Sequence, residues 1–495
     1  MKYLSFFVFI LTLTLSRESF AQDGTLDSSF GSNGIVTTDL GAWDNGEGVA
    51  VQTDGKITIA GYSYSSDTVY YALTKYNTDG SIDSSFGNDG KVMTYIQGIA
   101  ATGWNDLMIQ SNGTIVTCGG KYLIYILARY NADGSLDSTF GINGIAEVQS
   151  YDLVASLTAL AIQSDGKIVA TGYTGHYIMD TYFWIALVRF NSDGTFDGLA
   201  CEFSVDTVGF DQDFLDEGLA VAIQEDSKII VGGVASGKMF VVRFNNDFSR
   251  DNSFGANGVV KIGVGNGSTG VQSIAIQSDQ KILIAGGSTE GVTLMRLNVD
   301  GVLDNSFGQG GKVIMPIGIS YEAKSIAVLQ DDKIQMVCND FTVARFNING
   351  DLDSSFGFNG IVTNEIGVSN SMAIQTGGNI VVAGSAGDDF AVARYISSLE
   401  VGLIDLSSLN SSILIYPNPI TESATLKYTL QTPETISIHL FDVQGKLLKT
   451  FIENEKQDAG EHQQEISFPD PLPSGVYFLK ISGANGGNVS VKVIK

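Results

Sequence analysis

The 495-residue sequence is poor in cationic side chains, and this shortage argues against partners that are recognised by basic residues. It has 28 Lys and Arg against 54 Asp and Glu, for a formal net charge of −26. The first 21 residues carry +1 and residues 412–495 carry −2, which leaves −25 on residues 22–411. Nucleic acids are bound by basic residues that contact phosphates, so we expect no nucleic-acid partner. The acidic surface suits a soluble extracellular protein and permits divalent cations.

Cysteine and histidine are also scarce. Cys118, Cys201 and Cys338 are an odd number without motif spacing, so we expect buried small apolar side chains and no disulfide or metal site. Residues 22–396 contain one histidine, His176, which excludes a multi-histidine metal centre. A Ser-His-Asp triad would have to use that residue. No local motif indicates paired carboxylates for glycoside hydrolysis, so we predict no catalytic residue.

Long apolar runs are missing except at the start of the chain. Residues 1–21 combine Lys2, the apolar core YLSFFVFILTLTL and a small-x-small site ending at Ala21, which together predict a cleaved signal peptide. The core is shorter than the roughly 20 residues that a membrane span needs. We therefore expect a mature chain from about Gln22 without a transmembrane span, the alternative being an uncleaved anchor.

What the sequence has in abundance is one repeated phrase. Three landmarks recur about every 54 residues between residues 22 and 396, and each position occurs seven times. A Gln ends an apolar run, an aromatic residue ends a later one, and D-x-x-F follows; the fourth copy keeps Asp197 but loses the Phe. The landmarks are Gln52, Gln110, Gln163, Gln224, Gln277, Leu329 and Gln375; Tyr76, Tyr130, Phe190, Phe244, Leu297, Phe346 and Tyr395; and Phe30, Phe86, Phe140, Phe254, Phe307 and Phe356.

Each repeat contains four short strand candidates separated by Asp-Gly, Asn-Gly or Gly-Gly turns, and no segment has a helical period. In the first unit they are GIVTT, GVAVQ, ITIAGYS and YALTKYN. Four antiparallel strands in about 54 residues match a β-propeller blade, whereas a solenoid coil needs about half that length. The sequence therefore predicts an all-β fold with a seven-bladed β-propeller over residues 22–396. If GIVTT is the outermost strand of its blade, it completes the seventh blade; if it is the innermost, the units are in register from the start.

The repeats resemble the delta-60 repeat family through Q-x-D-G-K-I, A-G-Y, R-[YF]-N-x-D-G and D-S-S-F-G. The resemblance implies a propeller-like repeat whose biochemical role is largely unassigned.

The composition changes near residue 396. Six of the seven prolines lie beyond it, and the segment 397–411 loses the repeat and predicts a linker. Residues 412–495 alternate apolar and polar positions in LKYTL, ISIHLFD, GVYFLKIS and VSVKVIK. This pattern predicts a small antiparallel β-sandwich.

This C-terminal segment resembles the sorting domain of type IX secretion substrates. The resemblance covers Y-P-N-P, L-F-D-V-Q-G-K, L-P-S-G-V-Y-F-L-K-I and the basic last strand, in that order. It implies the type IX secretion machinery as a partner, passage across the outer membrane with removal of this domain, and release or attachment at the cell surface. The alternative is an ordinary accessory sandwich. The motif residues are Tyr416, Pro417, Asn418, Pro419, Gly445, Gly475 and Tyr477.

The repeated acidic and basic residues allow structural and functional interpretations. An Asp that opens a tight turn accepts hydrogen bonds from the following N–H groups, and this is the interpretation we favour. Calcium is the alternative, since N-x-D-G-x-x-D places Asn77, Asp79 and Asp83 in one loop, but the bidentate Glu of an EF-hand is missing. We therefore predict no cofactor and keep calcium as the alternative. Each repeat also has one cationic residue, which we expect to neutralise a turn Asp. The alternative is that these residues form a ring that binds acidic glycans. The residues are Lys75, Arg129, Arg189, Arg243, Arg296, Arg345 and Arg394.

Two aromatic-rich segments interrupt the pattern, Tyr62 to Tyr71 and His176 to Trp184, and we expect both to be loops. Exposed aromatic rings beside polar groups suit carbohydrate or protein contact, although packing between blades is an equal alternative. We therefore predict a secreted or cell-surface propeller that acts as a binding, adhesion or scaffold module for a glycan or protein. The competing prediction is a polysaccharide hydrolase or lyase that uses the propeller face. The predicted ligand residues are Tyr62, Tyr64, Tyr70, Tyr71, His176, Tyr177, Tyr182 and Trp184.

Overall fold

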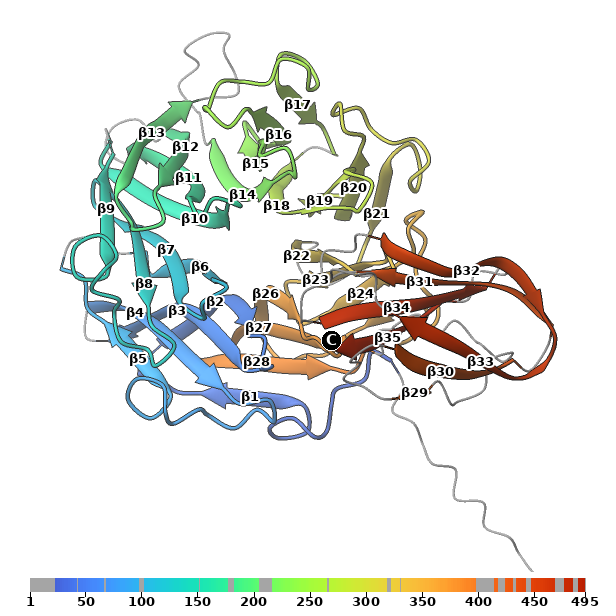
Figure 1. Cartoon of the computed structure of the whole chain (residues 1–495). Coiled ribbons are helices and arrows are strands. Elements are labelled where there is room, and N and C mark those ends of the chain that lie inside the picture. The colour runs from blue at the N-terminus through green and yellow to red at the C-terminus, as the bar shows by residue number, and fades with distance from the viewer. Residues whose placement is uncertain are drawn as a thin grey trace, which may run out of the picture. The chain divides into compact units, whose positions relative to one another are not determined.

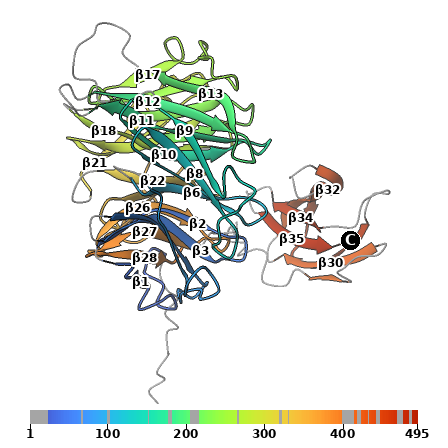
Figure 2. The same cartoon turned by 90° about the vertical axis from the view of Figure 1, so that its left-hand side faces the viewer.

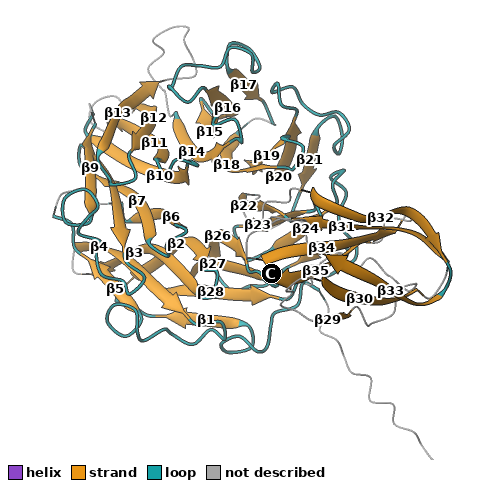
Figure 3. Cartoon of the chain, in the orientation of Figure 1, coloured by secondary structure: helices purple, strands orange, loops and turns teal. Residues whose placement is uncertain are grey.

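The computed structural model forms two compact units, residues 1–397 and 398–495 (Figure 1). It describes residues 23–397 and 414–494 except 42, 66–67, 98–101, 151, 177–181, 204–215, 265–266, 318–321, 330, 417–422, 431–432, 442–446, 468–475 and 484–487. The predicted signal peptide and the predicted linker, apart from Ser397, lie outside these residues. The described residues form strands and loops and no helix (Figure 3). The described part of the chain therefore has no helix long and apolar enough to cross a membrane.

The first unit contains seven four-stranded antiparallel sheets in its described part, one for each predicted blade. Blades 1 to 3 are β2 (Trp43–Val51), β3 (Ile57–Ser65), β4 (Thr68–Tyr76) and β5 (Lys91–Thr94); β6 (Trp104–Ile109), β7 (Ile115–Lys121), β8 (Ile124–Tyr130) and β9 (Ile145–Gln149); and β10 (Val154–Ile162), β11 (Ile168–His176), β12 (Tyr182–Phe190) and β13 (Phe196–Phe203). Blades 4 and 5 are β14 (Glu217–Ile223), β15 (Ile229–Ala235), β16 (Lys238–Phe244) and β17 (Val259–Ile262); and β18 (Ser268–Ile276), β19 (Ile282–Ser288), β20 (Gly291–Leu297) and β21 (Lys312–Met315). Blade 6 is β22 (Ala323–Val328), β23 (Ile334–Cys338), β24 (Val343–Phe346) and β25 (Ile361–Val362), and blade 7 is β26 (Val368–Ile374), β27 (Ile380–Ala386), β28 (Asp389–Tyr395) and β1 (Ile35–Thr38).

The first strand of the chain closes the ring. β1 pairs antiparallel with β28, from Ile35 opposite Ala393 to Thr38 opposite Phe390, and therefore forms the outermost strand of blade 7 (Figure 2). The innermost strands contact one another in sequence around the ring, and β2 of blade 1 contacts β26 of blade 7. The structure thus decides between the two predicted arrangements: the GIVTT strand is outermost and completes the last blade.

The two ends of the propeller differ in what they contain. At one end, which we call the repeat end, lie the turns between the first and second strands of each blade and the loops between the third and fourth. The Lys56 ammonium in the first kind of turn contacts the Asp83 carboxylate in the second at 2.8 Å. At the other end, the variable end, lie the hairpins between second and third strands and the connections between blades.

The core of the propeller lies between adjacent blades. One buried cluster, for example, combines Ala60 and Leu73 of blade 1 with Trp104, Ile115 and other residues of blade 2. Cys118 and Cys338 are buried free thiols in second strands, as the sequence predicted, and Cys201 is half-buried. Burial of apolar side chains on both faces explains why the second and third strands are nearly continuous apolar runs.

The second unit is a β-sandwich. One sheet contains β29 (Leu414–Tyr416), β30 (Ser423–Leu430) and β33 (Gly460–Ser467). The other contains β32 (Leu447–Gln457), β31 (Glu434–Phe441), β34 (Val476–Gly483) and β35 (Asn488–Ile494). Leu426 and Ile466 of the first sheet and Ile438 and Leu479 of the second belong to one buried cluster, which is the core of this unit.

Candidate functional site

The repeated aspartates at the repeat end are turn-forming residues. In the loop after β8, the Asp137 Oδ1 atom accepts hydrogen bonds from the backbone N–H of Thr139 at 2.9 Å and from its hydroxyl at 2.6 Å. The other carboxylate oxygen accepts a bond from Arg129 Nε at 2.8 Å. The same paired contacts occur at Asp27, Asp251, Asp304 and Asp353.

The repeated cation links each blade to the next one. The Arg129 guanidinium lies 4.6 Å from the centroid of the Phe140 ring and donates to the main-chain oxygen of Ser192 in the following blade at 2.6 Å. Equivalent bonds to the next blade occur at Lys75, Arg189, Arg243, Arg296 and Arg394. Most of these cations are buried and bonded to structural partners, as the favoured interpretation predicted, and glycan binding by the ring stays an untested alternative.

Three copies of this arrangement depart from the pattern. In blade 6 the Arg345 guanidinium donates to the Asp23 carboxylate at 3.1 Å and not to a main-chain oxygen. In blade 1 the Asp83 carboxylate pairs with Lys56, while Lys75 donates to Ala132 of blade 2. In blade 3, where the sequence reads FDGLACEF, the residues form the strand β13, and the Arg189 guanidinium lies 5.4 Å from the ring of Phe248 in blade 4. The inter-blade contact is therefore kept even where the D-S-S-F-G phrase is lost.

These contacts lower the pKa of the turn carboxylates. For Asp353, burial acts to raise the pKa, but hydrogen bonds from Ser355 and the charges of Arg345 and Lys333 outweigh it and lower the pKa to about 2. For Asp83, burial is likewise outweighed by Lys56 and Ser85, and the pKa is again about 2. The carboxylates are thus held ionised by their structural partners.

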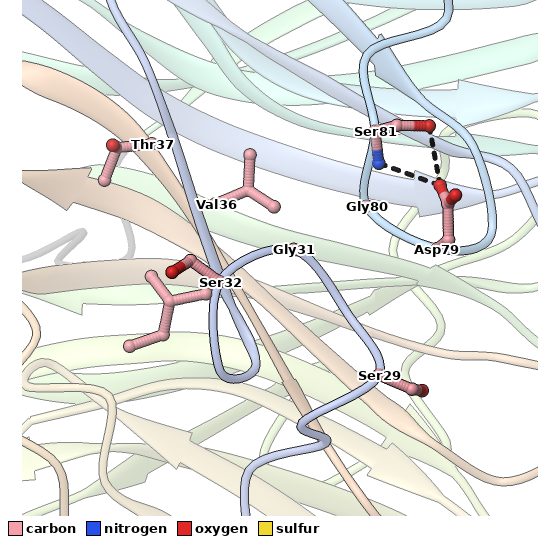
Figure 4. Close-up of a pocket in the computed structure, with 9 residues that line it drawn as sticks. Ser29, Gly31, Ser32, Val36, Thr37, Asp79, Gly80 and Ser81 are labelled. Carbon is pink, nitrogen blue, oxygen red and sulfur yellow. Dashed lines mark hydrogen bonds between the residues drawn. The ribbon is translucent and has the colours of Figure 1, made fainter.

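The loop in which we considered calcium uses its polar groups internally. The Asn77 amide donates to the Ser81 hydroxyl at 3.0 Å, and Asp79 Oδ1 accepts the Ser81 N–H at 2.9 Å (Figure 4). Asp83 pairs with Lys56 as described above. Calcium at this loop stays an untested alternative.

A hollow of about 760 Å³ lies at the repeat end where β1 of blade 7 meets the Asp79–Ser81 turn of blade 1 (Figure 4). Its lining includes Ser29, Gly31 and Val36. Corresponding hollows recur where Gly87 and Val92 meet the Asp133 turn and where Gly141 and Ala146 meet the Gly194 turn. Because the same junction produces a hollow in several blades, it follows from the repeat and does not single out one ligand site.

A different pocket lies at the variable end, and it does not follow the repeat. It has a volume of about 420 Å³ and combines aromatic with polar side chains from three successive blades. Blade 1 supplies most of the aromatic lining, and blades 2 and 3 supply amide and hydroxyl groups. The lining residues are Trp43, Glu47, Tyr62, Tyr64 and Val69 of blade 1, Thr102 and Asn105 of blade 2, and Ser156, Thr158 and Tyr173 of blade 3.

The polar residues of this pocket are positioned by β-bulges. The pairing of β2 with β3 shifts register between Gly46 and Gly48, which leaves Glu47 as the extra residue of the innermost strand. Bulges bend a strand and redirect one side chain, which is why they occur near functional sites. Every innermost strand has such an extra residue five positions before its Gln or Leu landmark: Glu47, Asn105, Thr158, Leu219, Gln272, Lys324 and Asn370.

Several bulge side chains bond to the next blade. The Asn105 amide donates to the Ser156 hydroxyl at 2.9 Å and to the Leu157 carbonyl at 2.7 Å. The Thr158 hydroxyl donates to the Gly218 carbonyl at 2.6 Å, and the Asn370 amide donates to the Gly46 carbonyl at 2.9 Å. These bonds hold the amide and hydroxyl side chains in one orientation on strands, as a specific binding site requires.

Glu47 is the only acid among the described residues that line the pocket. Its carboxylate accepts a hydrogen bond from the Asn45 amide at 2.6 Å. Burial raises the pKa of Glu47 to about 7, against the opposing effects of the Lys324 charge and the Asn45 bond. Near neutral pH this group therefore exists in both protonation states and can donate or accept a hydrogen bond.

The aromatic rim of the pocket is packed but still exposed. The Trp43 and Tyr62 rings meet edge to face with centroids 5.7 Å apart, and the exposed fractions of Trp43 and Tyr64 are 47% and 40%. Gly103, with φ at +79°, allows the chain entering β6 to approach the rim; a Cβ there would lie 2.5 Å from Tyr62 Cβ. Exposed rings held in this way offer contact area at low entropic cost.

The structure places the predicted ligand residues in different environments. Tyr62 and Tyr64 line the pocket, Tyr70 is half-buried with its ring 6.1 Å from that of Tyr95, and Trp184 is 38% exposed on β12. Tyr71 is a correction: it is fully buried, its ring lies 4.5 Å from that of Trp104, and its hydroxyl donates to the Gly120 carbonyl. It belongs to the inter-blade core.

The expected loops are also corrected. Tyr62 to Tyr71 lie mostly on the paired strands β3 and β4, which extend to Ser65 and Thr68 because cross-strand pairs of aromatic and β-branched residues favour pairing. His176 ends β11 and pairs with Tyr182 of β12, and the side chains of both lie outside the description, as does the whole of Tyr177.

Sequence reasoning missed Trp43, Glu47, Asn105 and Tyr173. The available signal was the position five residues before each Gln or Leu landmark, which carries a different residue in most blades. A repeat position whose residue differs between blades marks a place where the blades differ chemically. Glu47, Asn105 and Thr158 occupy this position in the three blades that form the pocket.

The sorting-motif residues are only partly described. Tyr477 is buried on β34, and Tyr416 ends β29, where its backbone pairs with Thr425. The remaining motif residues, Pro417, Asn418, Pro419, Gly445 and Gly475, lie outside the described residues.

Comparison with known proteins gives two family matches. Residues 52–86, 110–140, 163–198, 224–254 and 277–307 match the model of a domain of unknown function, the DUF5122 β-propeller. Residues 414–495 match the secretion system C-terminal sorting domain.

Searches of whole proteins and solved structures add no closer relationship. No curated protein matches. Among solved structures, the WD40 β-propeller domain of Doa1 is 14% identical, with 74% of this chain and 98% of that chain covered and a TM-score of 0.42. Sqt1 from Chaetomium thermophilum is 12% identical, with 72% of this chain and 96% of that chain covered and a TM-score of 0.45. Five of the repeats thus match the DUF5122 β-propeller model and the C-terminal segment matches the type IX secretion sorting domain, which makes this a propeller protein exported to the cell surface or extracellular space.

Proposed function

We propose that the propeller binds a glycan at the cell surface through the variable-end pocket and so acts as a binding or adhesion module. The observation that carries this proposal is the combination of an exposed aromatic rim, Trp43, Tyr62 and Tyr64, with rigid polar groups at the bulge positions. Sugars present both apolar ring faces and hydroxyl groups, so their recognition needs aromatic surfaces and fixed hydrogen-bonding groups together.

The charge and rigidity of the pocket agree with a neutral sugar ligand. The Asn105 amide, the Thr158 hydroxyl and the Glu47 carboxyl are all hydrogen-bonding groups, and no Lys or Arg is among the described lining residues. An acidic glycan would meet Glu47 without a compensating cation in the lining. We therefore expect neutral oligosaccharides to bind better than uronic-acid or sulfated ones.

The test is a glycan array followed by titration calorimetry with the purified protein. Replacement of Trp43 by Ala should weaken binding by at least about tenfold, because aromatic anchors dominate such sites. The matched control is Trp184→Ala, which removes another exposed indole outside the pocket lining and should leave the affinity unchanged. A blank array, or equal losses in both variants, would refute binding at this pocket.

The competing function is a surface hydrolase or lyase, and the raised pKa of Glu47 is the observation in its favour. Glycoside hydrolysis by the usual mechanisms uses two carboxyl groups, whereas the described lining contains one. Glu47→Gln distinguishes the two functions. A binding site should keep most of its affinity in this variant, whereas an enzyme that uses Glu47 as its acid or base should lose turnover of the bound oligosaccharide.

A further inference from the structure

A group of three acidic residues lies where the ring closes. One carboxylate oxygen from each of Asp39, Asp44 and Asp389 lies within 4.8 Å of the other two. Asp39 and Asp44 belong to the connection from β1 to β2 and to the start of β2, and Asp389 begins β28, the partner of β1. The group therefore joins the first blade to the last one through three different segments.

These carboxylates are not neutralised by the protein. Among the described residues none of the three forms a salt bridge, and the nearby Lys91 ammonium donates instead to the main-chain oxygen of Asp39 at 2.8 Å. By contrast, the turn aspartates Asp137 and Asp353 at the repeat end each have a cationic partner.

An independent observation at the same place is a pair of buried oxygen atoms without a hydrogen-bond partner. Asp44 is fully buried; its Oδ2 atom accepts the Leu40 N–H, but its Oδ1 atom has no partner. Ser63, which lies directly opposite Asp44 in the β2–β3 ladder, is also fully buried, and its hydroxyl has no partner either. Leaving a buried polar group unsatisfied is costly, so orphaned oxygens of this kind indicate a missing ligand.

The space beside these atoms is kept open by a glycine. A Cβ placed on Gly41 would lie 2.8 Å from Ser63 Oγ and 3.9 Å from Asp44 Oδ1, so both orphaned atoms border the volume that a side chain would fill. Oxygen ligands bind Ca²⁺ at about 2.3–2.6 Å, so two ligands of one ion are at most about 5 Å apart. The 4.8 Å spread of the three carboxylates meets this condition.

We propose that Asp39, Asp44 and Asp389, with Ser63 beside them, form a divalent-cation site of the calcium type that fastens the closure of the propeller. Three carboxylates and a hydroxyl are hard oxygen ligands, and water can complete the six to eight positions that Ca²⁺ takes. Zn²⁺ prefers nitrogen and sulfur ligands, which the group lacks. The site differs from the N-x-D-G-x-x-D loops, whose side chains are bonded within the repeat end.

The role of such an ion follows from its place. β1 contributes four residues to blade 7, and its pairing with β28 closes the ring. An ion held jointly by the β1–β2 connection and by β28 resists separation of these strands. A ligand that binds only the folded state stabilises it in proportion to its concentration, so the stability of the propeller should depend on extracellular calcium.

The experiment is calcium titration of the purified protein by calorimetry, together with its thermal midpoint in CaCl₂, MgCl₂ and EDTA. We expect one calcium equivalent to bind with a Kd in the range of roughly 10⁻⁴–10⁻³ M that is typical of extracellular modules. The midpoint should rise in CaCl₂ and rise less in MgCl₂. Absence of both the heat and the rise would overturn the site.

The residue test uses Asp389→Asn, with Asp39→Asn as a second variant if the first does not fold. Loss of even an outer-shell partner weakens metal binding about 10–100-fold, so loss of a ligand charge should weaken calcium binding at least tenfold. The control Asp300→Asn removes one exposed carboxylate from a repeat-end turn and should bind calcium like the unmodified protein. Equal calcium responses in Asp389→Asn and Asp300→Asn would assign the effect to the general acidity of the chain and refute the proposal.

Discussion

The repeat end and the variable end of the propeller are built by the same strands but follow opposite rules. At the repeat end, an aspartate, an arginine and a phenylalanine recur in the same contacts from blade to blade, as at Asp251, Arg243 and Phe254. At the variable end, the bulge residue changes with every blade, from Glu47 to Asn105 to Thr158. The contacts that recur from blade to blade hold the ring together, whereas the side chains that differ between blades can form a binding site in one part of the ring.

The difference also appears in how polar groups are satisfied. At the repeat end, Asp83 and Asp353 have nearby cations and hydroxyl groups, and their pKa values are lowered. At the variable end the pKa values of Glu47 and Asp389 are raised, mainly by burial. Perturbed carboxyl groups of the second kind are typical of binding and functional sites, whereas the first kind belongs to structural ion pairs. The two ends should therefore respond differently to mutation.

The largest expected effect is at the repeat end. Arg243→Ala leaves the buried Asp251 carboxylate without its main partner and removes the bond to Val299 of the next blade. Breaking a buried pair from one side costs about 3–5 kcal/mol, and the remaining contact from Lys228 places the expected loss at the lower end. Urea unfolding measures this loss.

Arg243→Lys is the matched control for that variant. It keeps the charge, and blade 1 already uses a lysine, Lys75, at this position, so it should lose less than half as much stability. A loss below about 1 kcal/mol in Arg243→Ala would mean that the repeated cation is a surface ion pair and that the contrast between the two ends is false.

The second prediction is an acid transition that belongs to the repeat end. Asp83 and Asp353 have folded-state pKa values of about 2, below the ordinary value of 3.8. A lowered pKa contributes stability that is fully present above pH 4 and is lost as the pH falls from there through 2. The thermal midpoint should therefore fall steeply between pH 4 and pH 2.

The variant Asp353→Asn isolates one contribution to this transition. It should be less stable than the unmodified protein at pH 7, and the difference should shrink toward pH 2, where Asp353 itself becomes protonated. Asp300→Asn changes the net charge equally and should show no such convergence. A constant difference for Asp353→Asn from pH 7 to pH 2 would contradict the assignment.

The sequence predicted the repeat end well and the variable end poorly, for a physical reason. Turn formation by Asp137, Gly134 and their equivalents depends on local backbone preferences, so the phrase itself carries the information. The outer position of β1 depends on pairing with β28, more than 350 residues away, and no local pattern specifies it. Likewise, Tyr62 and Tyr71 belong to the same aromatic-rich segment, yet Tyr62 lines a pocket and Tyr71 is buried against Trp104. Their different environments depend on residues of blade 2, which the segment itself does not specify.

The third prediction uses Tyr71 to separate packing from binding. Tyr71→Phe keeps the ring that contacts Trp104 but removes the hydroxyl that bonds to the Gly120 carbonyl at 2.7 Å. A buried hydrogen bond contributes about 0.5–1.5 kcal/mol, and Gly120 keeps its bond from the Thr102 N–H, so the loss of stability should be small. Affinity for any glycan found on the array should not change; a clear loss of affinity at unchanged stability would return Tyr71 to the binding site.

The smallest expected effect, and the sharpest test of the contrast, is at the bulge position itself. Leu219 occupies this position in blade 4, outside the described pocket lining, and is half-buried. If the bulge residue varies because each blade is free to differ there, Leu219→Asn should change the free energy of unfolding by no more than about 0.5 kcal/mol and leave glycan affinity intact. The reciprocal variant, Asn105→Leu, removes the bonds to Ser156 and Leu157 that shape the pocket, so it should weaken glycan binding while the propeller still folds. Calorimetric titration and urea unfolding of both variants separate the outcomes.

Similar losses of stability in the two variants, with similar affinities, would show that the bulge residues are structural in every blade. The variable end would then not differ in kind from the repeat end.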